Sequence, residues 1–164
     1  MKHIAFIMLF ILCSCASDTY QHGVPNLAQV EPGLWRGGQP TSEGWRYLSS
    51  LGVRRTIKLN TEHEASDAPA HSNGIEVLRF PITATEQTIG KPGLSKLNAA
   101  VQAISTNGTY VHCQHGQDRT GLVIGAYRVR IEHWPKGQAY REMLTNRFHP
   151  LLRGLCWSWE EDVR

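Results

Sequence analysis

The sequence has few cysteines, no cluster of basic residues and no apolar run long enough to span a membrane. Its four cysteines, at positions 13, 15, 113 and 156, are too few and too unevenly spaced for a disulfide scaffold or a paired Cys-x-x-Cys zinc site. The net charge is only +3, and no run of lysines and arginines is present of the kind that wraps nucleic acid. We therefore expect neither a cysteine-stapled fold nor a nucleic-acid-binding protein.

The longest apolar run, residues 4–13, is about half as long as a transmembrane helix. It follows a basic start and precedes a patch of small residues, which predicts a bacterial-type secretory signal over residues 1–16 and no transmembrane span. Cleavage after Ala16 would release a soluble protein. The alternative, a lipoprotein box, would make Cys15 an acylated membrane anchor. Both alternatives predict export, to the periplasm or to a membrane surface.

The remaining chain is long enough for one domain with a substantial core. Of the 164 residues, 41% are hydrophobic and 19% are charged, as in an ordinary soluble globule. Residues 17–32 are polar and contain Gly23 and Pro25, which predicts a tether or a strand that leads into the domain. The domain itself is expected to occupy residues 33–164.

Strand-like and helix-like patterns alternate along this domain. Strands are expected at residues 34–35, 53–59, 75–80 and 109–112, and helices at residues 42–51, 94–105, 122–131 and 135–146 and around residues 157–159. Residues 61–73 are polar with room for a short helix, and residues 81–92 are expected to form a loop. This alternation predicts an α/β fold, with a central, mostly parallel sheet flanked by helices on both faces.

The most informative segment is residues 112–121, His-Cys-Gln-His-Gly-Gln-Asp-Arg-Thr-Gly, between the last strand and an apolar helix. A five-residue loop separates Cys113 from Arg119 and closes onto a helix N-terminus. Such a loop turns backbone N–H groups inward and forms a nest for a tetrahedral dianion such as phosphate. Gly116 permits close backbone approach, and Arg119 can donate to two phosphate oxygens. The same amides and the helix dipole favour the thiolate of Cys113.

This His-Cys-x5-Arg-Thr-Gly pattern resembles the cysteine-dependent protein tyrosine and dual-specificity phosphatases. Upstream, Leu-Trp-Arg-Gly-Gly-Gln-Pro at residues 34–40, on through Leu59 and Asn60, resembles the start of small bacterial dual-specificity domains. The resemblance covers residues 34–160. It implies a protein tyrosine phosphatase-like fold of the dual-specificity type and a phosphoric monoester hydrolase that works without a metal or other cofactor.

The resemblance also implies roles for the loop residues. Cys113 would form a phosphocysteine intermediate, and Arg119 would bind the phosphoryl group in the ground and transition states. The Thr120 hydroxyl would donate to the Cys113 sulfur, and His112 would orient the loop through its ring. The substrate-binding residues expected on the loop are Gln114, His115, Gly116, Gln117 and Thr120.

A phosphatase of this type needs a general acid to protonate the leaving group. In much of the family this acid is an aspartate on the loop after the strand that is here predicted at residues 75–80. Residues 81–87 contain no aspartate, and their only carboxylate is Glu86. Asp118 is the favoured acid, because an Asp-Arg-Thr ending also occurs in myotubularin-like and Sac-like phosphoinositide phosphatases. Glu86 remains the alternative, and either carboxylate could serve structure alone.

The Asp-Arg-Thr ending and the predicted export favour inositol polyphosphates or phosphoinositides as substrates, in resemblance to the phosphatase-fold phytases of bacteria. A phosphoprotein substrate is the alternative. Gln114 and Gln117 stand where several inositide enzymes carry lysines, so further positive charge must come from elsewhere in the chain. The candidates are Arg36, Arg54, Lys58, Lys91, Arg147 and Arg153.

Other functions remain open. Without a good acid, the loop would make a phosphate-binding module of low turnover, and a rhodanese-like sulfurtransferase also presents a cysteine below an anion loop. A zinc site of His112, Cys113 and His115 is disfavoured, because adjacent positions on a tight turn do not converge on one metal. In an exported protein, a disulfide between Cys113 and Cys156 would inactivate the loop or place it under redox control.

Overall fold

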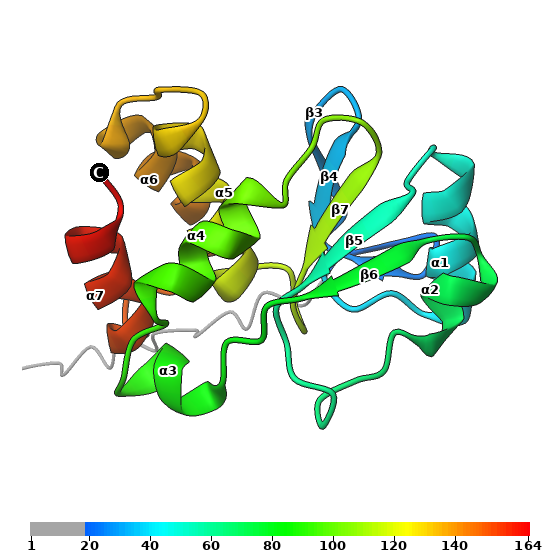
Figure 1. Ribbon diagram of the computed structural model, residues 1–164, viewed down its shortest axis with the longest axis horizontal. Helices are drawn as coiled ribbons and strands as arrows, with labels where there is room; N and C mark the ends of the chain where they lie inside the picture. Colours follow the sequence, from blue (N-terminus) through cyan, green and yellow to red (C-terminus); the bar gives the residue numbers. More distant parts are fainter. Residues whose placement is uncertain (1–18) are drawn as a thin grey trace, which may run out of the picture.

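The computed structural model describes residues 19–164, which fold around a five-stranded sheet (Figure 1). The strands, in spatial order, are β3 (Ala28–Glu31), β4 (Leu34–Gly37), β7 (Thr109–His112), β5 (Arg55–Lys58) and β6 (Glu76–Arg79). The pair β3–β4 is antiparallel and the other three neighbouring pairs are parallel. The predicted α/β class with a mostly parallel sheet is confirmed. The predicted export signal and the acylated Cys15 lie outside the described residues.

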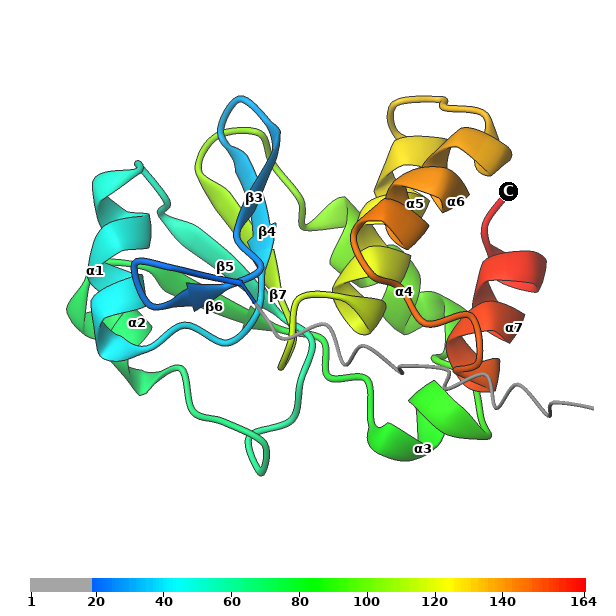
Figure 2. The ribbon, with the colours of Figure 1, turned by 180° about the vertical axis from the view of Figure 1, so that it is seen from behind.

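Seven helices accompany the sheet within residues 19–164. They are α1 (Ser42–Ser50), α2 (Ala68–Ser72), α3 (Ala84–Thr88), α4 (Leu94–Gln102), α5 (Asp118–Arg130), α6 (Lys136–Thr145) and α7 (Arg153–Asp162). In both ribbon views α1 and α2 lie on one side of the sheet, and α4 to α7 gather on the other (Figures 1 and 2). No helix in this part of the chain combines the length and the apolar character that a bilayer crossing requires.

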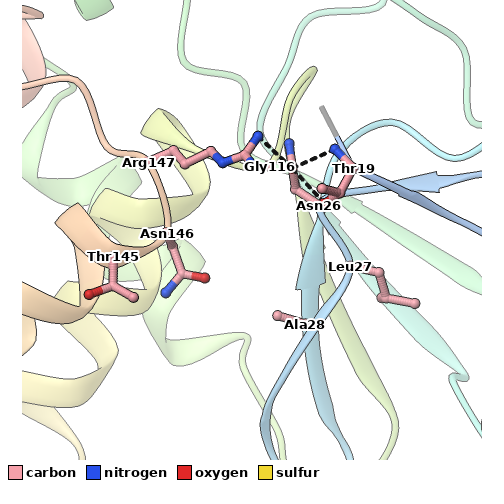
Figure 3. Close-up of a pocket in the computed structure, with 8 residues that line it drawn as sticks. All are labelled: Thr19, Asn26, Leu27, Ala28, Gly116, Thr145, Asn146 and Arg147. Carbon is pink, nitrogen blue, oxygen red and sulfur yellow. Dashed lines mark hydrogen bonds between the residues drawn. The ribbon is translucent and has the colours of Figure 1, made fainter. Parts of the chain in front are cut away.

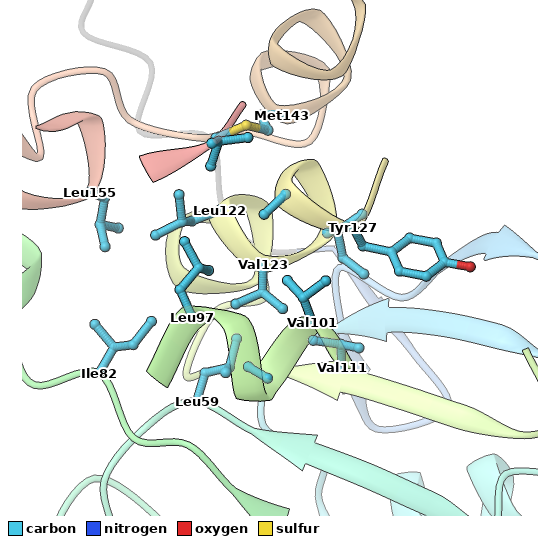
Figure 4. Close-up of a cluster of buried hydrophobic side chains, with 14 of the residues drawn as sticks. Leu59, Ile82, Leu97, Val101, Val111, Leu122, Val123, Tyr127, Met143 and Leu155 are labelled. Carbon is cyan, nitrogen blue, oxygen red and sulfur yellow. The ribbon is translucent and has the colours of Figure 1, made fainter. Parts of the chain in front are cut away.

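Two hydrophobic cores hold these layers together. Under α1 and α2, the side chains of Trp45, Leu48 and Tyr110 are completely buried against the sheet. The larger core lies between the sheet and α4 to α7, where Val111 of β7 contacts the apolar side of α5 (Figure 4). Because β7 is central and buried on both faces, its carboxyl end, from which residues 113–119 emerge, is held from two sides.

Local signals set the ends of several helices as predicted. The Thr41 side chain accepts a hydrogen bond from the Gly44 backbone N–H and caps α1, and Gly52 follows its end with a positive φ of 87°. Helix α3 lies inside residues 81–92, where a loop was predicted. Its signal was present, since Thr83 and Glu86 form a reciprocal capping box three residues apart.

The tether predicted over residues 17–32 is wrong for the part that the structure describes. Residues 20–25 form a hairpin of β1 (Tyr20–Gln21) and β2 (Val24–Pro25), and β3 is the edge strand of the main sheet. Val24 is fully buried against the α1 core. The alternative, a strand leading into the domain, is correct. Polar composition misled the prediction, because an edge strand buries only part of its surface.

Candidate active site

Residues 113–117 connect β7 to α5 at the carboxyl edge of the parallel strands, and the catalytic loop continues to Arg119. The segments that follow β4, β5 and β6 begin at the same edge, which is where α/β sheets bind ligands. Cys113 lies at the base of the loop and Arg119 on the first turn of α5, and both side chains are almost completely buried. The structure thus brings the predicted nucleophile and the predicted phosphate-binding arginine to one site.

The backbone carbonyls of the loop are held from outside. Gln39 N–H donates to the carbonyl of residue 114 at 3.0 Å, and Asn26 Nδ2 to that of residue 115 at 2.9 Å. Arg36 Nη2 donates to the carbonyls of residues 116 and 117 at 2.9 and 3.4 Å. In a trans peptide the N–H points opposite to the preceding carbonyl, so the N–H groups of residues 115–118 face the other way. This is the orientation that the predicted anion nest requires of its amides.

Arg36 is the buried cation behind this nest. Its side chain is 2% exposed, and burial lowers its pKa to about 10, against the opposing effects of the nearby Glu142 and Cys113. The guanidinium therefore remains charged at neutral pH. It fixes two loop carbonyls and also places a positive charge near the Cys113 sulfur.

The close approach of two glycine-containing segments explains the Arg-Gly-Gly-Gln-Pro sequence at residues 36–40. Gly116 has a φ of 75°, and a Cβ atom added there would lie 2.1 Å from the carbonyl carbon of Gly37. A Cβ added to Gly38 would lie 2.8 Å from the Gln114 carbonyl oxygen. The segment after β4 is therefore the support on which the loop rests, and a larger residue at Gly116 would displace it.

Glu64 pairs with Arg119, a contact that the sequence did not predict. Arg119 donates from Nη1 to Glu64 Oε2 at 2.9 Å and from Nη2 to Glu64 Oε1 at 2.5 Å, while Nη1 also donates to the Ile82 carbonyl at 3.0 Å. These three bonds come from Nη1 and Nη2 and occupy the outer edge of the guanidinium, the one that these two nitrogens form. One Nη2 proton and the Nε proton have no acceptor among the described residues. They share one edge, which matches two oxygens of a bound phosphate.

Glu64 is held as an anion. The hydrogen bond from Arg119 lowers the pKa of the Glu64 carboxyl to about 2, with help from the Thr61 backbone N–H and against a partial burial that raises it. In return, the pairing with Glu64 and the nearby Cys113 raise the pKa of Arg119 despite its burial. A carboxyl that remains ionised at neutral pH cannot donate a proton, so Glu64 orients Arg119 and is not the general acid.

A second carboxylate from the same loop holds His112. Asp67 is fully buried, and its Oδ2 lies 3.0 Å from His112 Nε2, while its Oδ1 accepts from Gln39 at 2.7 Å and lies 3.6 Å from Lys58 Nζ. Burial raises the pKa of Asp67, but these partners outweigh it and leave the pKa lowered. The His112 ring also stacks on Tyr110. Asp67 thus holds the ring of His112, whose Nδ1 has no hydrogen-bond partner among the described residues, and its role in orienting the loop stays a prediction.

The predicted bond from Thr120 to the Cys113 sulfur is not formed in this structure. The Thr120 hydroxyl is buried and has no hydrogen-bond partner among residues 19–164. Threonine χ1 in a helix has two populated rotamers, so a rotation can redirect this hydroxyl. Of the other predicted binding residues, Gln117 is buried, Gln114 is half-buried and His115 is exposed.

The structure separates the two acid candidates. Glu86 accepts from the Thr83 N–H at 2.8 Å and from Lys96 Nζ at 2.6 Å. Burial raises its pKa, but these bonds outweigh burial and leave it lowered, so Glu86 remains ionised. Asp118 begins α5 directly before Arg119, and its Oδ1 accepts from the backbone N–H and the ring Nδ1 of His149. Asp118 is thus the better placed of the two.

The six candidate cations lie in different places. Arg36 and Lys58 are buried behind the site, and Arg147 lies beside the loop (Figure 3). There Arg147 Nη1 is 3.4 Å from Asn26 Oδ1, above a pocket of about 160 Å³ that Gly116 also lines. Arg54 caps carbonyls near α1, Lys91 pairs with acids of α7, and Arg153 lines a groove with Ile89 and Trp157.

The cysteine alternatives find no support in the described residues. Cys113 and Cys156 are both free thiols, and Cys156 Sγ donates to the Pro150 carbonyl. No group of three or more His, Cys, Asp or Glu residues between positions 19 and 164 is arranged to hold a metal ion.

Four residues of the site escaped the sequence analysis: Asn26, Glu64, Asp67 and His149. Glu64 and Asp67 lie in the polar segment after β5 that was predicted only as a loop with a short helix. Their position after a parallel strand was the one available signal. No signal in the sequence pointed to His149, because it comes near the loop only through the packing of α6 and α7.

Comparison with known proteins agrees with this geometry. The chain is 31% identical over 146 residues to inositol diphosphatase DSP5 of Arabidopsis thaliana, covering 85% of this chain and 67% of that protein. Identity to inositol diphosphatase DSP2 of Oryza sativa is 28% over 114 residues, covering 66% and 55%. Identity to the dual specificity protein phosphatase TpbA of Pseudomonas aeruginosa is 28% over 126 residues, covering 75% and 55%. The chain thus spans little more than half the length of DSP2 and TpbA.

The fold agrees as well. The crystal structure of P. aeruginosa TpbA superposes with a TM-score of 0.68 at 24% sequence identity, covering 87% of this chain and 88% of that structure. Residues 24–149 match the tyrosine phosphatase family, and this range holds β2 to α6 and the whole catalytic loop. The chain therefore belongs to the tyrosine phosphatase family.

Proposed function

We propose that the protein is a cysteine-dependent phosphomonoesterase. One observation carries this proposal: groups outside the loop bind four of its carbonyls, so the four following amides point the other way, and Arg119 keeps one edge unpaired. This arrangement suits the charge of a trigonal bipyramidal phosphoryl group better than that of a small neutral ligand. Arg36 adds a buried positive charge behind the nucleophile.

The proposed reaction has two steps. The Cys113 thiolate attacks phosphorus, an S–P bond forms, and the P–O bond to the leaving alcohol breaks as its oxygen takes a proton from an acid. Water then attacks the phosphocysteine, loses a proton to the same group, and displaces the thiolate as inorganic phosphate is released. Mass spectrometry of an acid-quenched reaction would detect the phosphorylated Cys113 peptide.

As substrates we propose inositol polyphosphates or phosphoinositides. The relatives DSP2 and DSP5 are named inositol diphosphatases. Asp118 also gives the catalytic loop an Asp-Arg-Thr ending, which resembles that of phosphoinositide phosphatases. The test is phosphate release by the full chain from inositol hexakisphosphate, phosphoinositide vesicles and phosphotyrosine peptides. We expect the inositol compounds to give the highest kcat/KM, with a steep loss of binding as salt rises.

The second candidate is a dual-specificity protein phosphatase, which the likeness to TpbA favours. A higher kcat/KM on phosphotyrosine peptides than on every inositol compound would select it. A phosphate-binding module of low turnover is the third candidate function. It would turn over neither an aryl phosphate, whose leaving group needs little protonation, nor an alkyl phosphate.

We also propose that the protein is exported, either released by cleavage after Ala16 or anchored to a membrane through an acylated Cys15. The support is the sequence pattern of residues 1–16 alone. Metabolic labelling with a fatty acid, compared between the full chain and its Cys15→Ala variant, tests the anchor. Cell fractionation of the same two proteins tests the export.

A further inference from the structure

The segment between α6 and α7 runs along one side of the catalytic loop. Arg147 reaches Asn26, which holds a loop carbonyl, and Phe148 packs on α5, where a Cβ added to Gly121 would lie 3.4 Å from its ring. His149 comes next and contacts Asp118. Residues 147–149 therefore form a rim on the side of the loop where Asn26 and Asp118 lie.

His149 and Asp118 make two hydrogen bonds through one oxygen. The His149 backbone N–H and ring Nδ1 lie 2.8 and 2.9 Å from Asp118 Oδ1. An ionised carboxylate only accepts, so this contact places a proton on Nδ1. The other ring nitrogen, Nε2, has no partner among the described residues, and the side chain is 61% exposed while that of Asp118 is 13% exposed. Nε2 is therefore the atom of this pair that can exchange a proton at the mouth of the site.

We propose that His149 is the general acid of this phosphatase and that Asp118 is the positioning residue that holds its ring. The inference rests on the proposed function. In the first step, the Nε2–H bond of the imidazolium breaks and its proton goes to the leaving oxygen as the P–O bond breaks and the S–P bond forms. In the second step, neutral Nε2 takes a proton from the attacking water as the S–P bond breaks. The ring ends as it began.

The other carboxyls near the loop cannot fill this role as well. Glu64 is bound at both oxygens by Arg119, and Glu86 is bound by Lys96 and its own helix cap. Asp118 Oδ1 is already occupied by the two donors of His149. Both donors favour the ionised form of the Asp118 carboxylate, so we assign the proton that is transferred to the ring of His149. This arrangement also supplies an acid where residues 81–87 carry no aspartate.

Few other titratable groups act on this pair. Arg119 follows Asp118 on α5 and interacts with its charge, and Cys156 on α7 does so from the other side. Arg119 is tied to Glu64, and the Cys156 thiol donates to the Pro150 carbonyl. The pH measurement described below is therefore directed at the proton on His149.

The experiment compares two substrates and two variants of the full chain. p-Nitrophenyl phosphate needs little protonation of its leaving group, whereas glycerol 2-phosphate needs a full proton transfer. In His149→Asn, the amide Nδ2–H takes the place of the ring Nδ1–H and keeps the bond to Asp118, but no proton can be transferred. His149→Ala removes both the hydrogen bond to Asp118 and the proton that could be transferred. We expect each variant to lower kcat on glycerol phosphate about 100-fold and kcat on p-nitrophenyl phosphate less than about 3-fold.

The pH profile gives an independent measurement. With the wild-type chain, kcat on glycerol phosphate should fall as pH rises and the acid loses its proton. His149→Asn should lack this decline. The exposed His71 on α2 is the matched control, and His71→Asn should behave as wild type on both substrates.

Two outcomes would overturn the inference. If His149→Asn keeps the wild-type rate on glycerol phosphate while His149→Ala loses it, His149 only holds Asp118, which is then the acid. If both variants lower kcat equally on the two substrates, the contact between His149 and Asp118 is structural. A wild-type chain that hydrolyses neither substrate would instead contradict the proposed function, so the two failures are distinguishable.

Discussion

Glu64 holds the outer edge of the Arg119 guanidinium and leaves its inner edge for substrate. The two Nη–Oε bonds are 2.9 and 2.5 Å, and the Glu64 side chain remains 31% exposed on the loop after β5. An arginine with five donors has many orientations in an open site. The pairing selects one of them before substrate arrives, which lowers the entropic cost of forming the transition-state contacts.

Glu64→Gln should weaken this orientation without removing the side chain. We expect kcat/KM on p-nitrophenyl phosphate to fall about 10-fold, with more of the loss in kcat than in KM, because the contacts of Arg119 strengthen in the transition state. Glu62→Gln is the matched control, since Glu62 lies on the same loop but pairs with Arg79 and Lys58. An equal loss in both variants would mean that the loop as a whole, and not the pairing, is responsible.

The same pair predicts an acid dependence of stability. The folded-state pKa of Glu64 is about 2, below its ordinary value of 4.5, so its ionised form stabilises the fold. This contribution is complete above about pH 4.5 and is lost as pH falls toward 2. Glu64→Gln should therefore show a smaller decrease of Tm between pH 5 and pH 2 than wild type. A calorimetric pH series on both proteins checks it, and parallel curves would contradict it.

Cys113→Ser should abolish turnover and preserve the binding of phosphate. The nest amides and Arg119 do not depend on the sulfur, whereas the hydroxyl is a far weaker nucleophile. We expect a loss of at least about 10⁴-fold in kcat on p-nitrophenyl phosphate, and a phosphate Kd within about 5-fold of wild type by calorimetry. Turnover at the wild-type rate would exclude the phosphocysteine mechanism.

Arg36→Lys tests the support behind the loop. Lysine keeps the charge but cannot span the carbonyls of Gly116 and Gln117 with a planar guanidinium. We expect the free energy of unfolding to fall by about 2 kcal/mol and the affinity for phosphate to fall about 10-fold. Arg46→Lys on α1 is the control, because Arg46 is exposed and lies on the far side of the sheet. Unchanged phosphate affinity would show that the nest forms without Arg36.

Asp67→Asn should destabilise the fold more than it changes the chemistry. Asp67 is the buried anion between His112 and Lys58, and removing its charge leaves Lys58 buried beside fewer acceptors. We expect a loss of about 3 kcal/mol in the free energy of unfolding. Urea denaturation at pH 7 measures it. Glu160→Gln, at an exposed position of α7, should cost less than about 1 kcal/mol.

Much of the fold follows from the sequence. The β7 strand, the start of α1 at residue 42 and the alternation of strands and helices were all predicted, because the spacing of hydrophobic residues and the capping residues are local signals. The loop of residues 112–121 was likewise predicted, since its chemistry is contained in ten consecutive residues. Helix α3 was not predicted and residues 20–31 were left between a tether and a strand, because a short helix and an edge strand bury too little surface to leave a clear pattern.

The sequence by itself determined that Cys113 and Arg119 share one anion-binding turn at the end of a buried strand. Only the tertiary structure decided which groups hold that turn: Arg36 and Asn26 behind it, Glu64 beside Arg119, and His149 beside Asp118. Glu64 is 55 residues from Arg119, and His149 is 31 residues from Asp118. Such pairs meet because separate strands and helices end at one edge of the sheet, and no local pattern in the sequence records which side chains the packing will bring together.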